Sequence, residues 1–298
     1  MNKVGFKSGF VTITGRTNVG KSTLLNRMVG QKVAIMSDKP QTTRHKIQSV
    51  LTGEDYQVVF IDTPGIHKPK HKLGERMVET ALRTLREVDI IMLLVEAAMP
   101  GPGDNYIIGR VKQVSQPVIL VINKVDLVKP AELAPIIQTF SELHAFDEII
   151  PVSALTGENV EKLRQLIVDR LPEGPQYYPD NVVVDRPERF IMAELIREKV
   201  LQLTSQEVPH SVAVVIEEVE QRSENLVAVS AIIYTERESQ KGILIGKGGS
   251  MLKEVGKLAR EEMEGLLGSK IFLELWVKVK KDWRNHDIQM KNFGFIEE

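Results

Sequence analysis

The sequence contains no cysteine, and this absence excludes three classes of site at once. Disulfide scaffolds, thiolate metal sites and cysteine nucleophiles all need that residue. The N-terminal residues lack the long apolar core of a signal peptide. No stretch reaches the ~18 uncharged apolar residues that a membrane-spanning helix needs. We therefore expect a cytoplasmic protein from a reducing compartment.

The sequence also lacks an excess of either charge, because 39 Lys and Arg residues face 40 Asp and Glu residues. Any nucleic-acid site must therefore come from a local cluster of basic residues rather than from the net charge. Aromatic residues are few, at 5%, but hydrophobic residues make up 42% of 298 residues. That content is enough for sizeable cores, and the length suggests two domains.

The first chemical signal is the stretch at 15–22, which follows a short apolar run, Phe10–Thr14, and precedes a segment with helical spacing. It matches the G-x-x-x-x-G-K-[ST] pattern, in which backbone N–H groups cradle phosphates. We predict that Lys21 contacts the β- and γ-phosphates as a catalytic residue and that Ser22 binds Mg²⁺. The expected nucleotide contacts here are Gly15, Arg16, Thr17, Asn18, Val19, Gly20, Lys21, Ser22 and Thr23.

Around this stretch, apolar runs alternate with segments of helical period up to about residue 172. The expected strands are Phe10–Thr14, Val58–Ile61, Ile90–Val95, Val118–Ile122 and Glu148–Val152. The expected helices are Lys21–Val29, Leu73–Val88, Asp104–Val114, Glu132–Leu143 and Val160–Leu171. This alternation predicts an α/β domain with a doubly wound, mostly parallel sheet. A hairpin between Lys46–Leu51 and Gln57–Ile61 predicts one antiparallel edge strand.

Three further polar motifs follow predicted strands at the edge where such a sheet binds its ligand. They comprise Asp62, Thr63, Pro64, Gly65 and Ile66, then Asn123, Lys124 and Asp126, and finally Ser153, Ala154 and Leu155. We expect all of these residues to contact the nucleotide. Each motif alone is common, but all of them in order at strand ends are difficult to explain by folding alone.

These motif residues have distinct expected roles. Asp62 would hold Mg²⁺ through a water, and Gly65 would bring its N–H close to a γ-phosphate. Asp126 can accept two hydrogen bonds from guanine, whereas adenine lacks that pair of donors. Asn123 would join its loop to the phosphate loop, and Lys124 would lie along the base. The Ala154 N–H would bind the guanine carbonyl oxygen.

A threonine in the segment 34–46 would complete the magnesium shell, and we favour Thr43 over Thr42. The phosphate loop, the D-x-x-G motif at 62–65 and the N-K-x-D motif at 123–126 resemble those of GTPases. In Ras-like members of that class a glutamine positions the attacking water, but Ile66 occupies that position here. We therefore assign no general base. Asn18 offers an alternative, because its equivalent in related GTPases helps to hold a potassium ion that offsets transition-state charge. Asn18 could equally hydrogen-bond within its own turn.

A proline-rich stretch separates the two expected domains, which we place at 1–172 and 186–298 with a linker at 173–185. The second part reads as a helix at Glu188–Thr204, strands at Val212–Glu220 and Leu226–Thr235, a glycine loop, a helix at Ser250–Leu267 and a strand at Lys270–Lys280. This order predicts a smaller α+β domain. Trp276 is expected in the core because it alternates within a strand, whereas Trp283 could stack on a base, although interdomain or core packing is favoured.

The glycine loop has the G-x-x-G form of a KH domain and lies directly before a helix. Such a loop allows a nucleic-acid backbone to approach closely, while the helix start and a lysine supply N–H donors and charge. The expected RNA contacts are Gly246, Lys247, Gly248, Gly249 and Lys253. The helix-first order of elements resembles a type II KH domain.

The motifs at 15–22, 43, 62–65, 123–126 and 153–155 resemble those of a translation-factor-class GTPase domain, that is, an α/β P-loop GTPase domain. Together with the glycine loop, Gln41–Arg44, His210–Val214 and Trp276–Lys280, they make the whole chain similar to the Era family. The resemblance implies hydrolysis of GTP to GDP with Mg²⁺, and switch segments at about 32–46 and 63–80. It also implies a bacterial, monomeric protein that binds the 3′ end of small-subunit ribosomal RNA and assists small-subunit maturation. Peripheral contact with the inner face of the cell membrane is implied as well.

Two alternatives remain open at this point. The chain could be a tRNA-modifying or other ribosome-associated GTPase whose C-terminal domain is a protein-interaction module. It could also be an ATPase, although Asp126 argues against that assignment.

Overall fold

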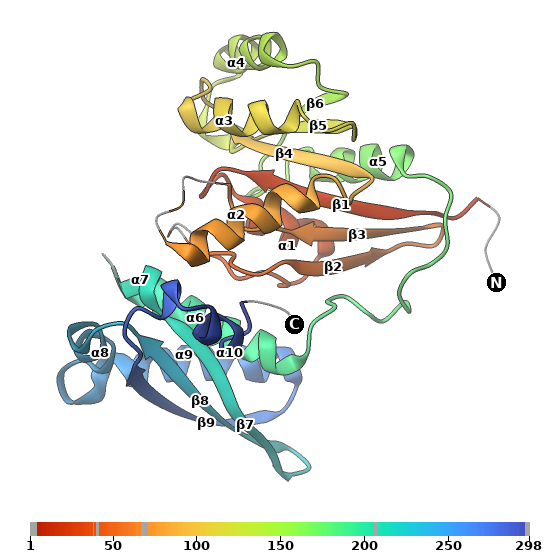
Figure 1. The fold of residues 1–298 in the computed structure, drawn as a ribbon. Helices are drawn as coiled ribbons and strands as arrows, with labels where there is room; N and C mark the ends of the chain where they lie inside the picture. Colours follow the sequence, from red (N-terminus) through yellow and green to blue (C-terminus); the bar gives the residue numbers. More distant parts are fainter. Residues whose placement is uncertain are drawn as a thin grey trace. The chain divides into compact units, whose positions relative to one another are not determined.

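The computed structural model describes residues 5–37, 39, 42–66, 69, 71–205 and 208–295. The chain divides into two compact units (Figure 1). The first consists of Met1–Met36, Thr43–Lys70 and Gly74–Asp185. The second consists of Ser37–Thr42, His71–Leu73 and Arg186–Glu298. Among the described residues, no helix combines the length and apolar character that a membrane-spanning segment requires.

The first unit is built on a six-stranded sheet of order β2-β3-β1-β4-β5-β6. Its strands are β1 (Lys7–Gly15), β2 (Ile47–Thr52), β3 (Tyr56–Asp62), β4 (Ile90–Glu96), β5 (Val118–Asn123) and β6 (Glu148–Pro151). All neighbouring pairs are parallel except β2 with β3, which is antiparallel. The predicted mostly parallel sheet with one antiparallel edge strand is therefore confirmed.

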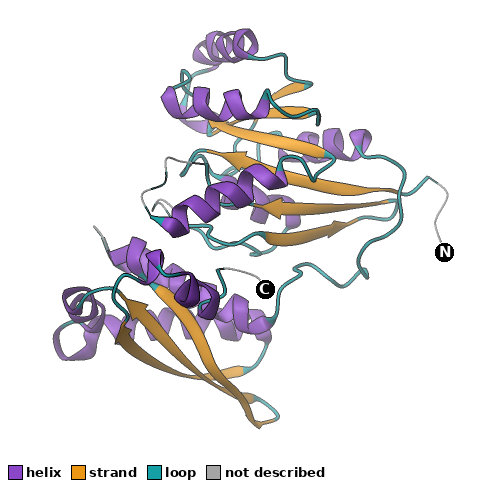
Figure 2. Cartoon of the chain, viewed as in Figure 1, coloured by secondary structure: helices purple, strands orange, loops and turns teal. Residues whose placement is uncertain are grey.

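Helices cover both faces of this sheet (Figures 1 and 2). They are α1 (Lys21–Val29), α2 (Lys72–Thr84), α3 (Pro102–Val111), α4 (Pro130–Leu143) and α5 (Val160–Arg170). One hydrophobic core joins α1 and α5 to the sheet, and a second joins α2, α3 and α4 to the other face. Because both faces are buried, the central strands are almost wholly apolar. The sheet therefore holds the loops at its carboxyl edge on a rigid base.

The proline-rich segment is more ordered than a free linker. Its residues 183–185 follow the open edge of β2, where Val50 N–H donates to the Val183 carbonyl and Asp185 N–H donates to the Gln48 carbonyl. The Tyr178 hydroxyl oxygen lies 2.7 Å from Oε1 of Gln48 and 2.8 Å from Oδ2 of Asp185, and its single O–H can donate to either acceptor. Pairing of this kind satisfies backbone groups that an edge strand would otherwise leave exposed.

The second unit contains a three-stranded sheet of order β7-β8-β9. Its strands are β7 (Ala213–Ser223), β8 (Leu226–Thr235) and β9 (Lys270–Val279). Its helices are α6 (Glu188–Leu203), α7 (Val208–Ser211), α8 (Glu238–Ile245), α9 (Ser250–Leu267) and α10 (Asp287–Asn292). A single core packs α6, α8 and α9 against one face of the sheet. The helix α8 was not predicted from the sequence.

The two tryptophans differ in burial. Trp283 is fully buried, and its indole N–H donates to the Ser211 carbonyl at 2.8 Å, so its predicted packing role is confirmed. The prediction for Trp276 is wrong, because this side chain is 61% exposed. Alternation within a strand places a residue on one of two faces, but it cannot reveal which face the helices cover.

Candidate nucleotide site and nucleic-acid groove

The phosphate loop depends on two glycines with backbone conformations that other residues rarely adopt. Gly15 has a φ of +151°, and a Cβ atom there would lie 2.3 Å from the Leu94 carbonyl oxygen. Gly20 has a φ of +98°, and a Cβ atom there would lie 2.2 Å from Nδ2 of Asn123. Both spacings are shorter than van der Waals contact allows. The loop therefore fits tightly between β4 and the end of β5.

Lys21 is buried and its ammonium group is held inside the loop. Its Nζ donates to the carbonyl oxygens of Gly15 and Arg16 at 3.2 and 2.6 Å. Burial lowers the pKa of Lys21 to about 8, and the opposite charge of Asp62 offsets part of that effect. A Cβ atom on Gly65 would lie 3.3 Å from this Nζ. The structure thus brings together Lys21 and Gly65, the two residues predicted to contact the γ-phosphate.

The three residues predicted to bind Mg²⁺ form one cluster. Ser22 Oγ and Thr43 Oγ1 are 3.3 Å apart, and Thr43 Oγ1 donates to Asp62 Oδ2 at 3.1 Å. The other carboxylate oxygen, Oδ1 of Asp62, is buried without a hydrogen-bond partner. Burial raises the pKa of Asp62 to about 6, although Lys21 opposes the shift. Two hydroxyls and a buried carboxylate with a free oxygen fit the oxygen ligands that Mg²⁺ prefers.

The choice between the two threonines follows from their contacts. Thr43 is buried beside Asp62, whereas the Thr42 hydroxyl donates to the Lys39 carbonyl at 2.6 Å. This agrees with the preference for Thr43. Parts of the two expected switch segments, including Gln41, lie outside the described residues.

Asn123 links the phosphate loop to the loops that would hold the base. Its Nδ2 donates to the Val19 carbonyl at 2.8 Å, and its Oδ1 accepts from the Ala154 N–H at 2.9 Å. Asn123, Val19 and Ala154 are all buried. The predicted tie from Asn123 to the phosphate loop is therefore present. The Ala154 N–H donates to Asn123 in this structure, and its contact with the guanine carbonyl oxygen stays a prediction.

Asp126 lies at the same end of the sheet, where the Ser153 hydroxyl donates to its Oδ1 at 2.5 Å. This contact orients a carboxylate that the sequence predicts to read guanine. Two residues earlier in the motif, Lys124 has a φ of +67°, which is unusual for a lysine. Its ammonium group pairs with Glu96 at the end of β4. Glu96 was not predicted, although its place directly after an apolar strand is the signal that identified the other motifs.

A second unpredicted residue is Asp104 in the first turn of α3. Its carboxylate Oδ2 accepts from Nη1 of Arg16 at 3.0 Å and from the Gly101 N–H at 2.9 Å. A Cβ atom on Gly103 would lie 2.9 Å from Cδ of Arg16. The Arg16 side chain is therefore directed toward α3, while its carbonyl holds Lys21. The sequence Gly-Pro-Gly-Asp at 101–104 is the signal that could have revealed this contact.

The remaining predicted contacts serve mainly to support the site. Ile66 is 3% exposed and packs in the core with α2 and α3, so its side chain does not face the phosphate loop's ligand space. Thr63 donates to the Ile13 carbonyl at 3.3 Å, and Pro64 is buried beside it. Leu155 is exposed, and its carbonyl accepts from Nη2 of Arg27 at 2.7 Å. Asn18 has a φ of +67°, a turn conformation that asparagine tolerates well.

In the second unit, the glycine loop joins α8 to α9. Gly246, Gly248 and Gly249 have φ values of +72°, +61° and +81°. A Cβ atom on Gly246 would lie 2.8 Å from the backbone nitrogen of Met251, so the loop folds tightly onto the start of α9. Lys247 lies between these glycines. The loop thus offers backbone N–H groups and one cation at a helix N-terminus.

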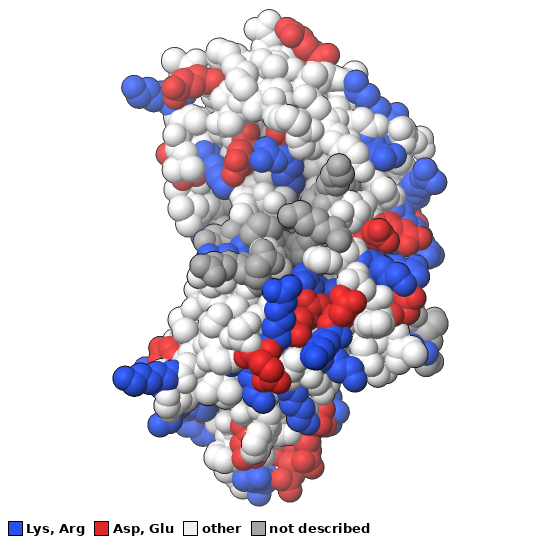
Figure 3. Space-filling view, turned by 60° about the vertical axis from the view of Figure 1, so that its left-hand side comes forward, with Lys and Arg blue, Asp and Glu red and all other residues white. Residues whose placement is uncertain are grey.

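A groove of about 410 Å³ runs beside this loop, between α9 and β9. It is lined by Gly249, Leu252, Lys253, Gly256, Lys257, Arg260, Leu273 and Leu275. These described lining residues include three cations and no carboxylate. The face displayed in Figure 3, by contrast, mixes both signs of charge. A cationic groove with an apolar floor suits a nucleic-acid backbone with its bases turned inward.

The similarities to known proteins fall on the same two parts of the chain. A family model described as a 50S ribosome-binding GTPase matches residues 10–124, and a KH-domain model matches residues 207–284. Two crystal structures are each 42% identical to the chain, with a TM-score of 0.94 over 98% of this chain and 100% of theirs. One is Era in complex with MgGDPNP and nucleotides 1506–1542 of 16S ribosomal RNA. The other is a variant of Aquifex aeolicus Era bound to GDP and AlF4⁻.

Proposed function

The chain belongs to the Era family, and from this premise we propose a GTPase that binds the 3′ end of small-subunit ribosomal RNA and assists small-subunit maturation. The reaction is hydrolysis of GTP to GDP and phosphate. The observation that carries the nucleotide assignment is Asn123, whose side chain holds the phosphate loop and the base loops together. The observation that carries the RNA assignment is the cationic groove beside the glycine loop.

Ser22, Thr43 and Asp62 would hold Mg²⁺, with Asp62 acting through a water. When bound, Mg²⁺ offsets charge on the β- and γ-phosphates. Lys21 lies among loop carbonyls in this structure and turns its ammonium group toward the phosphates when the nucleotide binds. Gly65 presents its N–H beside Lys21, because no Cβ atom blocks the approach. These residues bind and orient the γ-phosphate for attack by water.

Selection of guanine falls to Asp126, which Ser153 orients. The Asp126 carboxylate is exposed in this structure and would be covered by the bound base. A base that lacks the two donors would leave it without partners, so ATP should compete poorly. The test is Asp126→Asn, which should shift preference from GTP to xanthosine triphosphate in a phosphate-release assay. The conservative variant Asp147→Asn, remote from the motifs, should leave nucleotide preference unchanged. Equal competition by ATP in the unmutated protein would overturn the guanine assignment.

We assign no general base, because Ile66 packs in the core instead of facing the nucleotide. The proposal for charge compensation is a potassium ion that Asn18 helps to hold. The position of Asn18 within the phosphate loop, four residues before Ser22, supports this role. Hydrolysis should then be faster in KCl than in NaCl at equal ionic strength, and Asn18→Ala should remove the difference. Equal rates in the two salts would refute the role of potassium.

RNA binding is assigned to the glycine loop and the groove beside it. Lys247, Lys253 and the cations farther along α9 would contact phosphates, while the outer backbone groups of β9, an edge strand, can read bases. A double change, Lys247→Glu with Gly248→Asp, should abolish binding of a 3′-end fragment of small-subunit rRNA in a fluorescence anisotropy titration. Retention of binding would favour the alternative in which this unit is only a protein-interaction module.

The nucleotide state should control the RNA complex, because Thr43 and Gly65 are the residues that a γ-phosphate would order. If GTP changes the affinity for RNA, RNA must change the affinity for GTP by the same factor. Anisotropy titrations with the non-hydrolysable analogue and with GDP test this directly. Equal affinities in both states would rule out a nucleotide-controlled RNA switch.

Three further properties are proposed, the first from the composition of the sequence and the other two from the family resemblance. They are residence in the cytoplasm, peripheral contact with the inner face of the cell membrane, and a monomeric state. Co-sedimentation with vesicles of anionic lipid tests the membrane contact, and light scattering after gel filtration tests the monomer. Recovery of all protein in the supernatant, or a dimer mass at micromolar concentration, would contradict the corresponding proposal.

A further inference from the structure

The outer face of the β7-β8-β9 sheet carries two exposed aromatic side chains that neither proposed site uses. Phe272 and Trp276 lie on β9 and are 45% and 61% exposed. They pair in register with Ala228 and Ile232 on β8. Their neighbours in the strand, Ile271 and Val277, point to the opposite face and pack under the helices, since successive side chains alternate. The two aromatics therefore lie on the face that the helices leave open.

The C-terminal segment of the chain covers one end of this face. The Tyr234 ring lies 4.6 Å from the Phe293 ring, and Phe293 in turn contacts Trp283 at 5.3 Å. Tyr234 pairs in register with Lys278, so the covered end lies beyond Trp276. The other end, from Phe272 to Trp276, remains accessible. An exposed tryptophan and phenylalanine on one strand face are typical of a binding surface.

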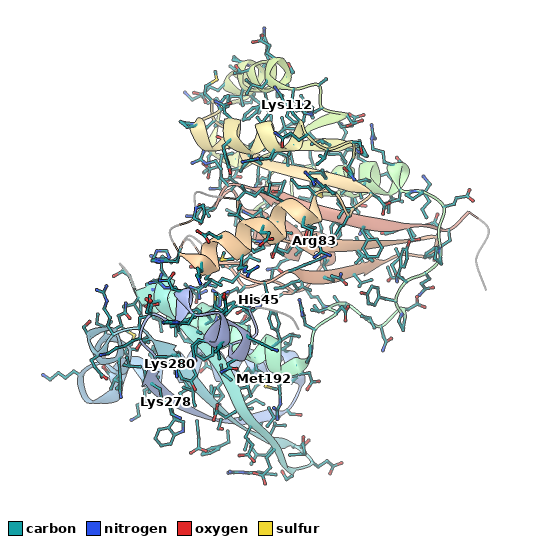
Figure 4. All side chains as sticks on the ribbon, viewed as in Figure 1. His45, Arg83, Lys112, Met192, Lys278 and Lys280 are labelled. Carbon is teal, nitrogen blue, oxygen red and sulfur yellow. The ribbon has the colours of Figure 1, made fainter. Side chains whose placement is uncertain are left out.

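The charges of this face argue against RNA as its partner. Three glutamates, Glu218, Glu220 and Glu274, share this face. Glu218 and Glu274 both pair in register with Ser230 of β8, and Glu220 and Phe272 both pair with Ala228. Three described cations, Arg222, Lys270 and Lys278, share the face, although Lys270 pairs with Glu264 of α9; Lys278 is labelled in Figure 4. Carboxylates repel phosphates. The groove on the helical side differs, because every charged residue among its described lining is a cation. A face with both signs around exposed aromatics is typical of a protein interface.

The chemistry of the partner can be inferred from an arrangement already present on this face. The Arg222 guanidinium lies 5.1 Å from the centre of the Phe272 ring, and its Nε lies 3.3 Å from Oε2 of Glu220. Thus one arginine joins an aromatic ring to a carboxylate. Trp276 supplies a second aromatic ring and Glu274 a second carboxylate, and the two residues lie two positions apart on the same face of β9. Among the described residues, Trp276 has no ring or cation contact and Glu274 has no ion pair.

We propose that an arginine of a small-subunit ribosomal protein completes this second pair by stacking on Trp276 and pairing with Glu274. Tryptophan is the aromatic that binds a guanidinium best, and arginine can satisfy a carboxylate at the same time. Lys278 lies on the other side of Trp276 along β9, so the partner should present its arginine toward Glu274 and an acidic or neutral group toward Lys278. This inference rests on the proposed association with the small subunit.

A photo-crosslinking experiment tests the proposal. The full chain carries p-benzoylphenylalanine in place of Trp276 and is mixed with purified small subunits and a non-hydrolysable GTP analogue. We expect crosslinks to an arginine-containing peptide of a ribosomal protein. The same label in place of Leu266, an exposed residue of α9, should not reach that peptide. Crosslinks to rRNA or to a second copy of the chain, or none at all, would overturn the proposal.

Affinity measurements separate this surface from RNA binding. Trp276→Ala should weaken binding to small subunits by roughly tenfold, the effect of losing an interface anchor, and Trp276→Phe should restore part of it. Glu274→Lys should weaken binding similarly, because it repels the partner's arginine. Each variant should bind the isolated 3′-end rRNA fragment with unchanged affinity.

The outcomes also separate the two proposals. If the unmutated chain binds neither the rRNA fragment nor small subunits, the proposed function fails and this inference fails with it. If the unmutated chain binds both, and Trp276→Ala and Glu274→Lys bind subunits as tightly as it does, only this inference fails. A loss of affinity for the rRNA fragment in Trp276→Ala would show that the face binds RNA and would also overturn the inference.

Discussion

Replacing Asn123 by alanine tests the central contact of the nucleotide site. The change removes a donor to the Val19 carbonyl at 2.8 Å and an acceptor for the Ala154 N–H at 2.9 Å. Both partners are buried, so water cannot easily replace the lost amide. A buried polar group left without a partner costs about 1–3 kcal/mol. We therefore expect Asn123→Ala to lower the free energy of unfolding by about 2–4 kcal/mol.

The same change should weaken nucleotide binding. In the unmutated chain the phosphate loop and the base loops are held together before the ligand arrives, whereas in Asn123→Ala the ligand must order them. A loss of about 1.4 kcal/mol of binding free energy is a tenfold change in Kd, and we expect at least that much. Asn123→Asp should lose a similar amount, because its carboxylate still accepts from Ala154 but faces the Val19 carbonyl with a second acceptor.

Two measurements check this prediction. Thermal unfolding should show a fall in Tm of about 5–15 °C for the GTPase unit, given ~2–4 °C per kcal/mol for a unit of this size. Release of a fluorescent GDP analogue, followed by stopped flow, should be at least tenfold faster. Asn105→Ala, an exposed asparagine on α3, is the matched control and should change neither value. If Asn123→Ala has the Tm and GDP release rate of the unmutated chain, the inferred coupling between the loops is wrong.

Three further predictions follow from contacts of the described residues. Asp104→Ala should lower the free energy of unfolding by about 1–2 kcal/mol, because α3 loses its cap and Arg16 loses its ion pair. Asp104→Asn should keep the cap and lose less stability. Equal losses for the two variants in urea unfolding would contradict that separation. Gly20→Ala should cost at least as much GDP affinity as Asn123→Ala, since its Cβ would overlap the Asn123 amide, and unchanged affinity by calorimetry would contradict the close approach. Trp283→Phe should lower the free energy of unfolding of the second unit by about 1–2 kcal/mol, because the Ser211 carbonyl loses its donor. An unchanged midpoint in urea unfolding of this unit would refute the prediction.

Much of the fold could be predicted because its signals are local. The central strands of the first unit are largely apolar, and the turn at 52–56 between two strand-like runs identifies the antiparallel edge. The helix α8 was harder to assign, since Lys241–Ile245 is a short apolar run that suits a strand or a helix equally well. Its first turn, Glu238–Gln240, is polar and lies outside that run. The sequence also could not show that residues 183–185 pair with β2, because that contact joins distant parts of the chain.

The candidate site divides in a similar way. Residues in named motifs, such as Lys21 and Asp62, are recognised by spacing alone, and the structure places them together. Glu96 and Asp104 have no motif of their own, because each acts on a motif residue through a side-chain contact that only the folded sheet creates. Trp276 was misplaced for a related reason. A period of two residues cannot distinguish a buried face from an open one without knowledge of the helices.

The strand β9 has a consequence for how this protein can change. Its odd-numbered residues, such as Leu273 and Leu275, line the RNA groove, while the even-numbered Phe272 and Trp276 form the aromatic face. A point substitution can therefore alter one surface and spare the other. A one-residue insertion in the turn at 268–269 would move every side chain of β9 to the opposite face if the register with β8 shifted. The two surfaces can thus diverge independently by substitution, but a change in length would disrupt both together.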